Sequence, residues 1–439
     1  MNTFTPRWSR RACLLATAAA LSLGSTATWA QAAAPAGAVA PVWNLAQQEQ
    51  PQLLETLKAI VNIETGSTNR AGLNKLSDLI AERLRALGGE VQLIEPVAAD
   101  VYRMEDTPDD IGRMVRATFK GTGSQRILMI AHMDTVYPEG LLAQQPFRID
   151  GNKAYGLGIA DDKQGVATIL HTLAMLKQLN IRDYGQITVL INGDEELSSP
   201  ASRKLMTRLG KEHDLVMSFE GSRVDSDKLA LATSGIGMAV ITVKGRASHS
   251  GSAPERGVNA LYELSHQMLQ LRDLSVPERG LKVNWTVAKA GVVRNMIPPG
   301  AQAWADIRLL KVSDLTELEK KVQERIKNKL LPESEVSVQF ENRRPPLEAT
   351  DGARKVAKYA QGVYKEIGKE LVVDDQPEGG GTDAAFAALE TKSPVIERFG
   401  LQGFGAHSNN AEYVLVDSIV PRLYLATRMI TDFSKGLAR

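Results

Sequence analysis

Apolar residues recur at spacings of three and four along the first part of the chain. This pattern predicts a helical stretch from Gln50 to Leu87 that ends at Gly88-Gly89, after an Ala-, Pro- and Gly-rich flexible lead-in at residues 31–42. Short buried strands and amphipathic helices then alternate. Strands are expected at residues 126–131, 186–192 and 215–219, and helices at 165–179 and 203–209. Such alternation predicts an α/β sheet covered by helices.

The pattern changes in the middle of the chain. Met238 to Lys244 alternates apolar and polar residues, and helices and alternating strands follow at residues 258–271, 285–290, 303–309, 315–329 and 336–340. This β-α-β-β-α-β order is typical of a small, ferredoxin-like α+β sandwich. We expect it as an insertion at residues 230–345, between the two parts of a larger α/β domain at 31–229 and 346–439.

The first thirty residues have a different composition. A basic start precedes a short, uncharged apolar stretch from Ala12 to Leu23, and small residues follow it. This is the layout of a secretory signal peptide, residues 1–30, and it predicts export to the periplasm or the medium. A membrane anchor is the less favoured alternative, because the apolar stretch is short for a bilayer. One arginine pair leaves the general and twin-arginine export routes open.

Composition narrows the chemistry further. The chain has 439 residues, of which 43% are hydrophobic, and this length favours two domains. Its 52 basic and 51 acidic residues nearly balance, which gives no support to nucleic-acid binding. The only cysteine, Cys13, would leave with the signal peptide. The mature chain would then have no disulfide, no cysteine nucleophile and no cysteine-ligated zinc.

Histidines and carboxylates follow the predicted strands, where α/β sheets place ligands. His132 and Asp134 come directly after the strand at 126–131, and the acidic run 194–196 comes after the strand at 186–192. Three neighbouring acids repel one another unless a cation lies among them. The remaining candidates lie in a Gly-rich loop, at a strand end and near the C-terminus: Asp161, Glu220 and His407.

Each of these segments alone could be a solvated surface loop. Together, two imidazoles and several carboxylates at strand ends make a plausible paired-zinc site, since zinc accepts nitrogen and oxygen ligands. Two zinc ions about 3.5–4 Å apart need a bridging group, and a carboxylate can bridge. The alternative that Gly156 to Gly158 binds a dinucleotide is disfavoured, because the third glycine is missing and Asp161 would face the pyrophosphate.

The order and spacing of these segments resemble the two-zinc aminoacylase/desuccinylase metallopeptidase superfamily. Within it, the chain is most similar to glutamate carboxypeptidases that act on folates. The similarity covers essentially the whole mature chain and includes His132 to Tyr137, Lys153 to Lys163, Gly379 to Ala385 and Gly400 to Tyr413. It implies a zinc-dependent exopeptidase that hydrolyses the amide bond to a C-terminal glutamate.

The resemblance also implies roles for individual residues. The ligands of two Zn²⁺ ions per subunit would be His132, Asp161, Glu196, Glu220 and His407. Asp161 would bridge the ions, with His132 and Glu220 completing one site and the other two residues completing the second. Glu195 would be the general base, and Asp134 would orient His132.

The resemblance further implies a homodimer formed through the inserted domain. His249 would reach into the partner's active site and stabilise the oxyanion. The implied substrate contacts are Lys228, Asn295, Arg308, Arg344 and Gly380. An arginine fork matches a carboxylate bidentately, which suits the free C-terminus of an exopeptidase substrate.

Three places depart from the family pattern, Leu197 to Pro200, Gly221 to Arg223 and Ser250 after His249, and they leave the exact substrate open. An aminoacylase or dipeptidase with another side-chain preference is therefore the first alternative. A non-catalytic peptide-binding dimer that has lost its metal is the second, and the retained ligands and Glu195 argue against it. No nucleic acid, and no membrane after signal cleavage, is expected as a partner.

Overall fold

A computed structural model describes residues 33–377, 380–408 and 411–438 of the chain. The predicted signal peptide at residues 1–30 lies outside the described residues, and so does Gly379, the first residue of the family-like segment Gly379 to Ala385. Among the described residues, no helix is long and apolar enough to cross a membrane.

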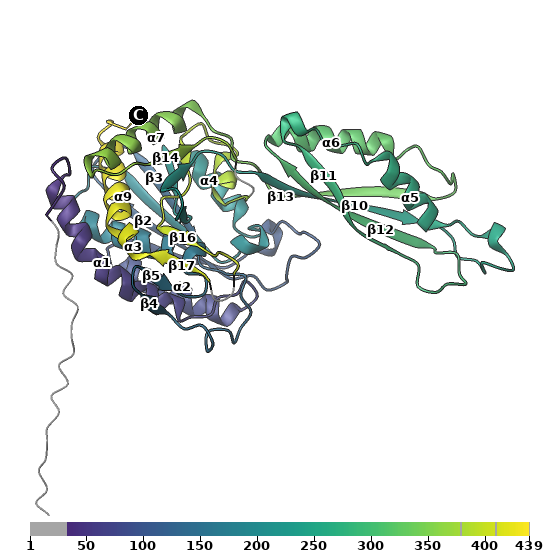
Figure 1. The fold of residues 1–439 in the computed structure, drawn as a ribbon, viewed down its shortest axis with the longest axis horizontal. Helices are drawn as coiled ribbons and strands as arrows, with labels where there is room; N and C mark the ends of the chain where they lie inside the picture. Colours follow the sequence, from purple (N-terminus) through teal and green to yellow (C-terminus); the bar gives the residue numbers. More distant parts are fainter. Residues whose placement is uncertain (1–32, 378–379, 409–410, 439) are drawn as a thin grey trace, which may run out of the picture. The chain divides into compact units, whose positions relative to one another are not determined.

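A six-stranded mixed sheet forms the centre of the α/β part (Figure 1). Its strands, in spatial order, are β1 (Glu90–Ile94), β2 (Met114–Lys120), β6 (Gln186–Asn192), β3 (Arg126–His132), β7 (Leu215–Ser218) and β15 (Val395–Ile396). The last four run parallel, whereas β1 and β2 are antiparallel to their neighbours. The parallel strands are buried on both faces, which explains why their sequences read as continuous apolar runs.

Helices cover both faces of this sheet, as the sequence predicts. On β3, Ile127 and Met129 belong to one buried cluster, and Leu128 and Ile130 belong to another. The first cluster includes residues of α1 (Ala40–Val61), α2 (Arg70–Ala86), α3 (Gln164–Gln178), α7 (Asp351–Glu366) and α9 (Ile419–Ser434). The second includes residues of α4 (Arg203–Glu212) and α8 (Ala384–Ala388).

The helical stretch predicted from Gln50 to Leu87 is two helices, and α1 already begins at Ala40, inside the expected lead-in. The chain between them leaves the helix to pair with the loop after β3. The Thr135 N–H donates to the Thr65 carbonyl at 2.8 Å, and the Ser67 N–H donates to the Thr135 carbonyl at 3.1 Å. Tertiary hydrogen bonds therefore replace helical ones at the break.

Two small sheets carry further loops of the α/β part. One has the order β4 (Arg148–Asp150), β5 (Lys153–Tyr155), β17 (Tyr413–Leu415), β16 (Gln402–Phe404) and β8 (Ser222–Arg223). The other pairs β14 (Val372–Asp374) with β9 (Lys228–Ala230). Strands β16 and β17 flank the segment that contains His407, and β8 begins two residues after Glu220.

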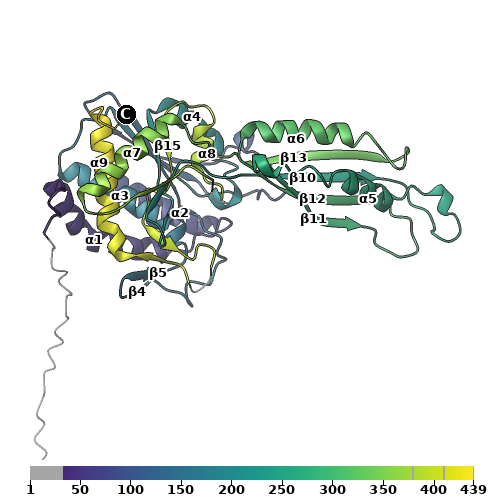
Figure 2. The same cartoon turned by 45° about the horizontal axis from the view of Figure 1, so that its top comes forward.

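The middle of the chain forms a four-stranded antiparallel sheet with two helices (Figure 2). Along the chain the elements are β10 (Gly235–Lys244), α5 (Ala260–Gln270), β11 (Lys282–Ala290), β12 (Gly300–Leu309), α6 (Val312–Arg325) and β13 (Glu335–Arg344). The spatial order is β11-β12-β10-β13. The predicted β-α-β-β-α-β order is confirmed, and these elements share a hydrophobic cluster of their own. The exact domain boundaries stay a prediction.

Candidate metal centre and active-site cleft

The candidate site begins at the C-terminal end of β3. His132 is 1% exposed, and its Nδ1 lies 3.1 Å from the Asp134 carbonyl oxygen and 3.4 Å from Asp134 Oδ1. The Asp134 carboxylate also accepts hydrogen bonds from the backbone N–H groups of Glu195 and Glu196, at 3.0 and 3.1 Å, and from Ser67 Oγ at 2.8 Å. Asp134 therefore holds the acidic loop as well as the imidazole, and the break between α1 and α2 supplies Ser67 for this purpose.

Asp161 lies between two histidines. Its Oδ1 is 2.9 Å from His132 Nε2, and its Oδ2 is 3.2 Å from His407 Nε2. Burial would raise the pKa of Asp161, but the hydrogen bonds with both imidazoles hold it below its ordinary value. Each oxygen of the Asp161 carboxylate therefore lies beside a different imidazole, which is the arrangement that a bridging ligand requires.

Two further carboxylates lie beside the same imidazoles. Glu220 Oε1 is 3.5 Å from His132 Nε2, and Glu196 Oε2 is 3.2 Å from His407 Nε2. Hydrogen bonds with Asp161 and Glu196 raise the pKa of His407 to about 11, and burial raises that of Glu196 to about 8. Protons shared among these groups are the ones that a bound metal ion would displace.

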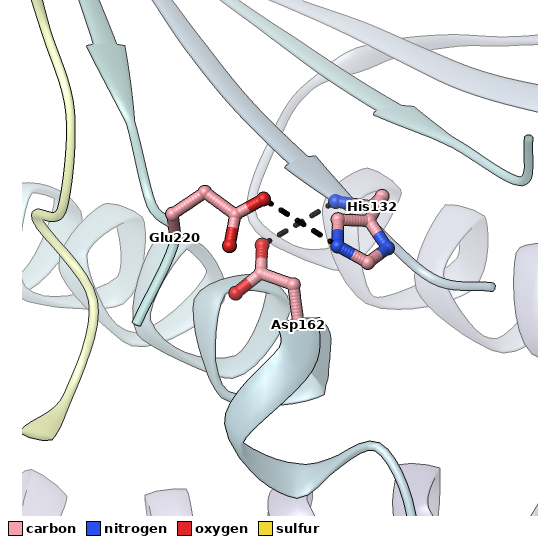
Figure 3. A group of neighbouring side chains, drawn as sticks. All are labelled: His132, Asp162 and Glu220. Atoms are coloured by element: carbon pink, nitrogen blue, oxygen red, sulfur yellow. Dashed lines mark hydrogen bonds and ion pairs between the residues drawn. The ribbon is translucent and has the colours of Figure 1, made fainter. Parts of the chain in front are cut away.

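In the described part of the chain, two groups of three side chains could each hold a metal ion: His132, Asp162 and Glu220, and Asp161, Glu196 and His407. Sequence reasoning gave no role to Asp162, which Figure 3 shows beside His132 and Glu220. Asp162 Oδ2 accepts the His132 backbone N–H at 3.4 Å, and its Oδ1 accepts from Gln164 Nε2 at 2.6 Å. Asp161, by contrast, contacts the ring nitrogen itself, so Asp161 fits the ligand role better and Asp162 supports its loop.

The three acidic residues after β6, Asp194 to Glu196, have different surroundings. Asp194 is buried and accepts hydrogen bonds from Asn192 Nδ2 at 3.0 Å, the Ala201 N–H at 2.7 Å and Ser202 Oγ at 2.6 Å. Only Glu195 and Glu196 turn toward the cleft. The expectation that three acids surround a cation is therefore too broad, because local hydrogen bonds already satisfy Asp194.

Glu195 is 6% exposed and pairs with Arg344, the last residue of β13. Arg344 Nη1 contacts Glu195 Oε1, and Nη2 donates to the Glu195 carbonyl at 2.6 Å. Nη1 also donates to the Gly381 carbonyl at 3.1 Å. Burial raises the pKa of Glu195, and the positive charge of Arg344 opposes that rise. A carboxylate in such a setting can both accept and return a proton.

Glu412 is a second residue without an assigned role in the sequence analysis. It is 3% exposed, and its Oε1 accepts the N–H groups of Ala160 and Asp161 at 2.8 and 3.1 Å. Its Oε2 accepts the Gly158 N–H at 2.9 Å and the Tyr137 hydroxyl at 2.6 Å. Glu412 therefore fixes the loop that carries Asp161. Its position shortly after His407 was the only signal in the sequence.

A cleft of about 700 Å³ opens onto these side chains. Among the residues predicted to contact substrate, Arg344 and Gly380 line it. Lys228 is buried instead, with its Nζ 3.5 Å from Asp374 Oδ2. Arg308 pairs within its own strand with Asp306, at 3.0 and 3.1 Å.

His249 and Asn295 lie together on two loops of the inserted unit. The Ser250 N–H donates to the Asn295 carbonyl at 3.1 Å, and His249 forms an isolated bridge with Met296. The described residues that line the cleft do not include His249 or Asn295. The structure therefore brings these two residues together, and neither is among the described residues that line the cleft with the candidate metal ligands.

Known proteins share this architecture. The model of the peptidase family M20/M25/M40 matches residues 128–432 of the chain. The chain belongs to this family. It is 44% identical over 395 residues to carboxypeptidase G2 of Pseudomonas sp. (strain RS-16), covering 90% of this chain and 92% of that relative.

Solved structures of peptidases have the same fold. Aminopeptidase PepT from Bacillus cereus superposes with a TM-score of 0.68 at 20% identity, covering 87% of this chain and 98% of that one. The M20 metallo-carboxypeptidase Sso-CP2 from Sulfolobus solfataricus superposes with a TM-score of 0.66 at 16% identity, covering 88% and 99%. At these identities the comparison shows the fold alone.

In this peptidase we expect Glu412→Ala to weaken metal binding by about 10- to 100-fold, as removal of partners that orient ligands usually does. The substitution removes the acceptor of three backbone N–H groups in the Gly158–Asp161 loop. Competition with a chromophoric chelator measures the change. Tyr137→Phe removes a single hydrogen bond to Glu412 and is the matched control, with a smaller effect expected. Unchanged affinity in a folded Glu412→Ala protein would contradict the role.

Proposed function

We propose that the protein is a zinc-dependent glutamate carboxypeptidase. It hydrolyses the amide bond to a C-terminal glutamate in acyl-glutamates, folates or small peptides. The observation that carries the proposal is the Asp161 carboxylate between His132 and His407, with Glu195 beside it in a cleft that also contains Arg344. Membership of a peptidase family and similarity to carboxypeptidase G2 support the reaction class.

The donor set fits zinc. It offers imidazole nitrogens and carboxylate oxygens at the ends of strands and in rigid loops, and no cysteine. We infer two Zn²⁺ ions per subunit, one held by His132, Asp161 and Glu220 and the other by Asp161, Glu196 and His407. When bound, the metals would polarise the scissile carbonyl and make a water molecule more acidic.

Glu195 supplies the proton transfers. Its carboxylate accepts a proton from the attacking water and delivers it to the leaving amide nitrogen. Arg344 is suited to bind the free α-carboxylate of the substrate, because a guanidinium can donate two parallel hydrogen bonds to a carboxylate. Its contact with the Gly381 carbonyl holds it next to the Gly380 backbone, where a substrate can approach closely.

We also propose a homodimer formed through the inserted unit. Strand β11 lies at the edge of its sheet, and α5, which packs against it, exposes Leu261, Tyr262 and Leu269 by 43%, 62% and 61%. An unpaired strand edge beside exposed apolar side chains is typical of a protein–protein interface. The β11 edge and α5 of two subunits are therefore the surfaces proposed to meet.

His249 is proposed to act across this dimer. Its Nδ1 accepts hydrogen bonds from the N–H groups of Gly251 and Ser252, both at 3.1 Å. In the neutral ring these contacts place the proton on Nε2, which can then donate to an oxyanion in the partner's cleft. Asn295, on the neighbouring loop, would approach the same cleft. Export through the signal peptide at residues 1–30 completes the proposal and rests on the sequence layout alone.

A substrate panel on the metal-loaded protein tests the reaction and its specificity. N-acyl-glutamate and a folate should be hydrolysed with a kcat/KM at least about 100-fold above that of N-acyl-leucine, because a site built for a polar group rejects an analogue lacking it. A preference for N-acyl-leucine would instead indicate an aminoacylase. Metal bound without any turnover would indicate a non-catalytic dimer. Metal content, measured alongside, should be two zinc ions per subunit.

A further inference from the structure

Two arginines that the sequence analysis did not assign line the active-site cleft, Arg223 and Arg398. Arg223 ends β8, three residues after Glu220. Arg398 follows the short strand β15 and is half-buried. Both side chains therefore share a cleft with the candidate metal ligands and with Glu195, and they add positive charge to a wall of that cleft.

Arg398 is held in an unusual conformation. Its φ is 71°, in the left-handed region that side-chain-bearing residues rarely adopt. Its Nη1 donates to the Gly221 carbonyl at 2.7 Å. Among the described residues, no carboxylate forms an ion pair with Arg398, and the contact with Gly221 uses only one of its five N–H donors. Strained backbone conformations cluster at functional sites, so the position of the Arg398 side chain is expected to contribute to ligand binding.

A buried arginine links the backbone segments that carry Arg398 and Arg223. Arg422 is fully buried, and its Nη1 donates to the Arg398 carbonyl at 2.7 Å. Its Nη2 donates to Ser222 Oγ at 2.6 Å and also contacts Asp227. One buried guanidinium thus ties the backbone of Arg398 to the strand that carries Arg223. The two cationic side chains project from a preorganised platform, which lowers the entropic cost of binding an anion.

Two other cationic candidates do not line the cleft and are already engaged by carboxylates: Lys228 lies 3.5 Å from Asp374, and Arg308 pairs with Asp306. Arg344 does line the cleft, and the proposed function assigns it to the α-carboxylate. Arg223 has a carboxylate only at 3.9 Å, from Asp225. A dicarboxylate substrate needs a second cationic partner besides the one that binds its α-carboxylate, and Arg398 lines the cleft and can provide it.

We propose that Arg398, assisted by Arg223, forms the subsite for the side-chain carboxylate of the leaving glutamate, while Arg344 takes the α-carboxylate. This assignment rests on the proposed glutamate carboxypeptidase function and specifies the residues that select the second carboxylate. It replaces Lys228, which the sequence resemblance suggested. Arg398 acts here as a specificity-determining residue, and it takes no part in the proton transfers.

The test compares N-benzoyl-glutamate with N-benzoyl-glutamine, which has the same shape and no side-chain charge. Loss of a charge-assisted hydrogen bond is worth on the order of 10- to 100-fold in binding. Arg398→Gln should therefore lower kcat/KM for N-benzoyl-glutamate by about that factor, mainly through KM. Its kcat/KM for N-benzoyl-glutamine should stay within about twofold of the wild-type value. Arg398→Lys, which keeps the charge, should recover part of the loss, and Arg223→Gln should have a smaller effect.

Arg354→Gln, at an exposed arginine on α7, is the matched control and should change neither substrate. Equal losses on both substrates would overturn the subsite and leave Arg398 with only its structural contact to Gly221. A fully retained preference for glutamate in Arg398→Gln would overturn it as well. A wild-type enzyme that does not prefer N-benzoyl-glutamate would overturn the glutamate function itself, so the two failures are distinguishable. Thermal unfolding and metal content confirm that each variant is folded and loaded.

Discussion

Glu195→Gln should lower kcat by about 10²- to 10⁴-fold while the protein keeps its metal. The amide preserves the size of the side chain but cannot accept a proton from water. The backbone N–H of residue 195 would still donate to Asp134, so the loop that carries Glu196 should keep its place. Steady-state kinetics and metal analysis of the same preparation measure the two effects together.

Glu390→Gln, at an exposed glutamate that pairs with Lys211, is the control for removal of one carboxylate and should be fully active. The assignment of Glu195 as the base would be wrong if Glu195→Gln retained wild-type kcat. Loss of metal together with activity would point to a structural role for the Glu195–Arg344 pair. These results separate proton transfer from metal retention.

Co-expression of His249→Ala and Glu195→Gln subunits should restore activity that neither homodimeric variant has. If His249 acts in the partner's cleft, one site of the mixed dimer combines an intact Glu195 from one subunit with an intact His249 from the other. That site should turn over at close to the wild-type rate, whereas each parent loses on the order of 10²-fold or more through its missing group. Different affinity tags on the two subunits allow the mixed dimer to be purified and assayed.

The double variant, with both substitutions in one chain, provides the matched control when it is paired with wild-type subunits. In that mixed dimer each site lacks one group, so little activity should remain. Mixed dimers of the single variants that are as inactive as their parents would show that His249 does not work in trans. A monomer in sedimentation experiments would exclude the dimer itself.

The apolar patterns predicted most of the fold because burial dictates them locally. Strands β3 and β6 lie between neighbours and between helical layers, so nearly every residue from Ile127 to Ala131 had to be apolar. In the inserted unit, alternate residues of β10 and β12 face α5 and α6, and this period of two is visible in the sequence.

Tertiary hydrogen bonds explain what the patterns missed. The break between α1 and α2 depends on contacts of Thr65 and Ser67 with Thr135, far away in the sequence. Apolar spacing continues on both sides of the break and does not reveal it, whereas Gly66 and the N-cap residue Asn69 are the local signals of it. The resemblance implied a substrate contact for Lys228, and that role stays a prediction; the parallel pairing of β9 with β14, which the sequence did not show, brings Asp374 beside it.

Contacts between residues far apart in the sequence also limit how well the individual side chains of the candidate site can be predicted. His132, Asp161 and His407 could be proposed from residue type and position, because metal chemistry restricts the choice. Glu412 and Arg398 could not, since a glutamate or arginine in a loop is usually solvated. Their significance comes from the N–H groups and carbonyl that converge on them, and only the folded chain brings those groups together.

The edge of the Trp43 ring in α1 packs against Tyr424 in α9, with the ring centroids 5.9 Å apart. The α/β layers are therefore closed by segments from opposite ends of the chain, whereas the core of the inserted unit uses only residues 239–338. Contacts between distant segments form slowly and late. The core of the inserted unit can therefore form without the last helix, whereas the catalytic layers need it. A chain truncated before His407 would keep the residues of the inserted core and lack one of the candidate metal ligands.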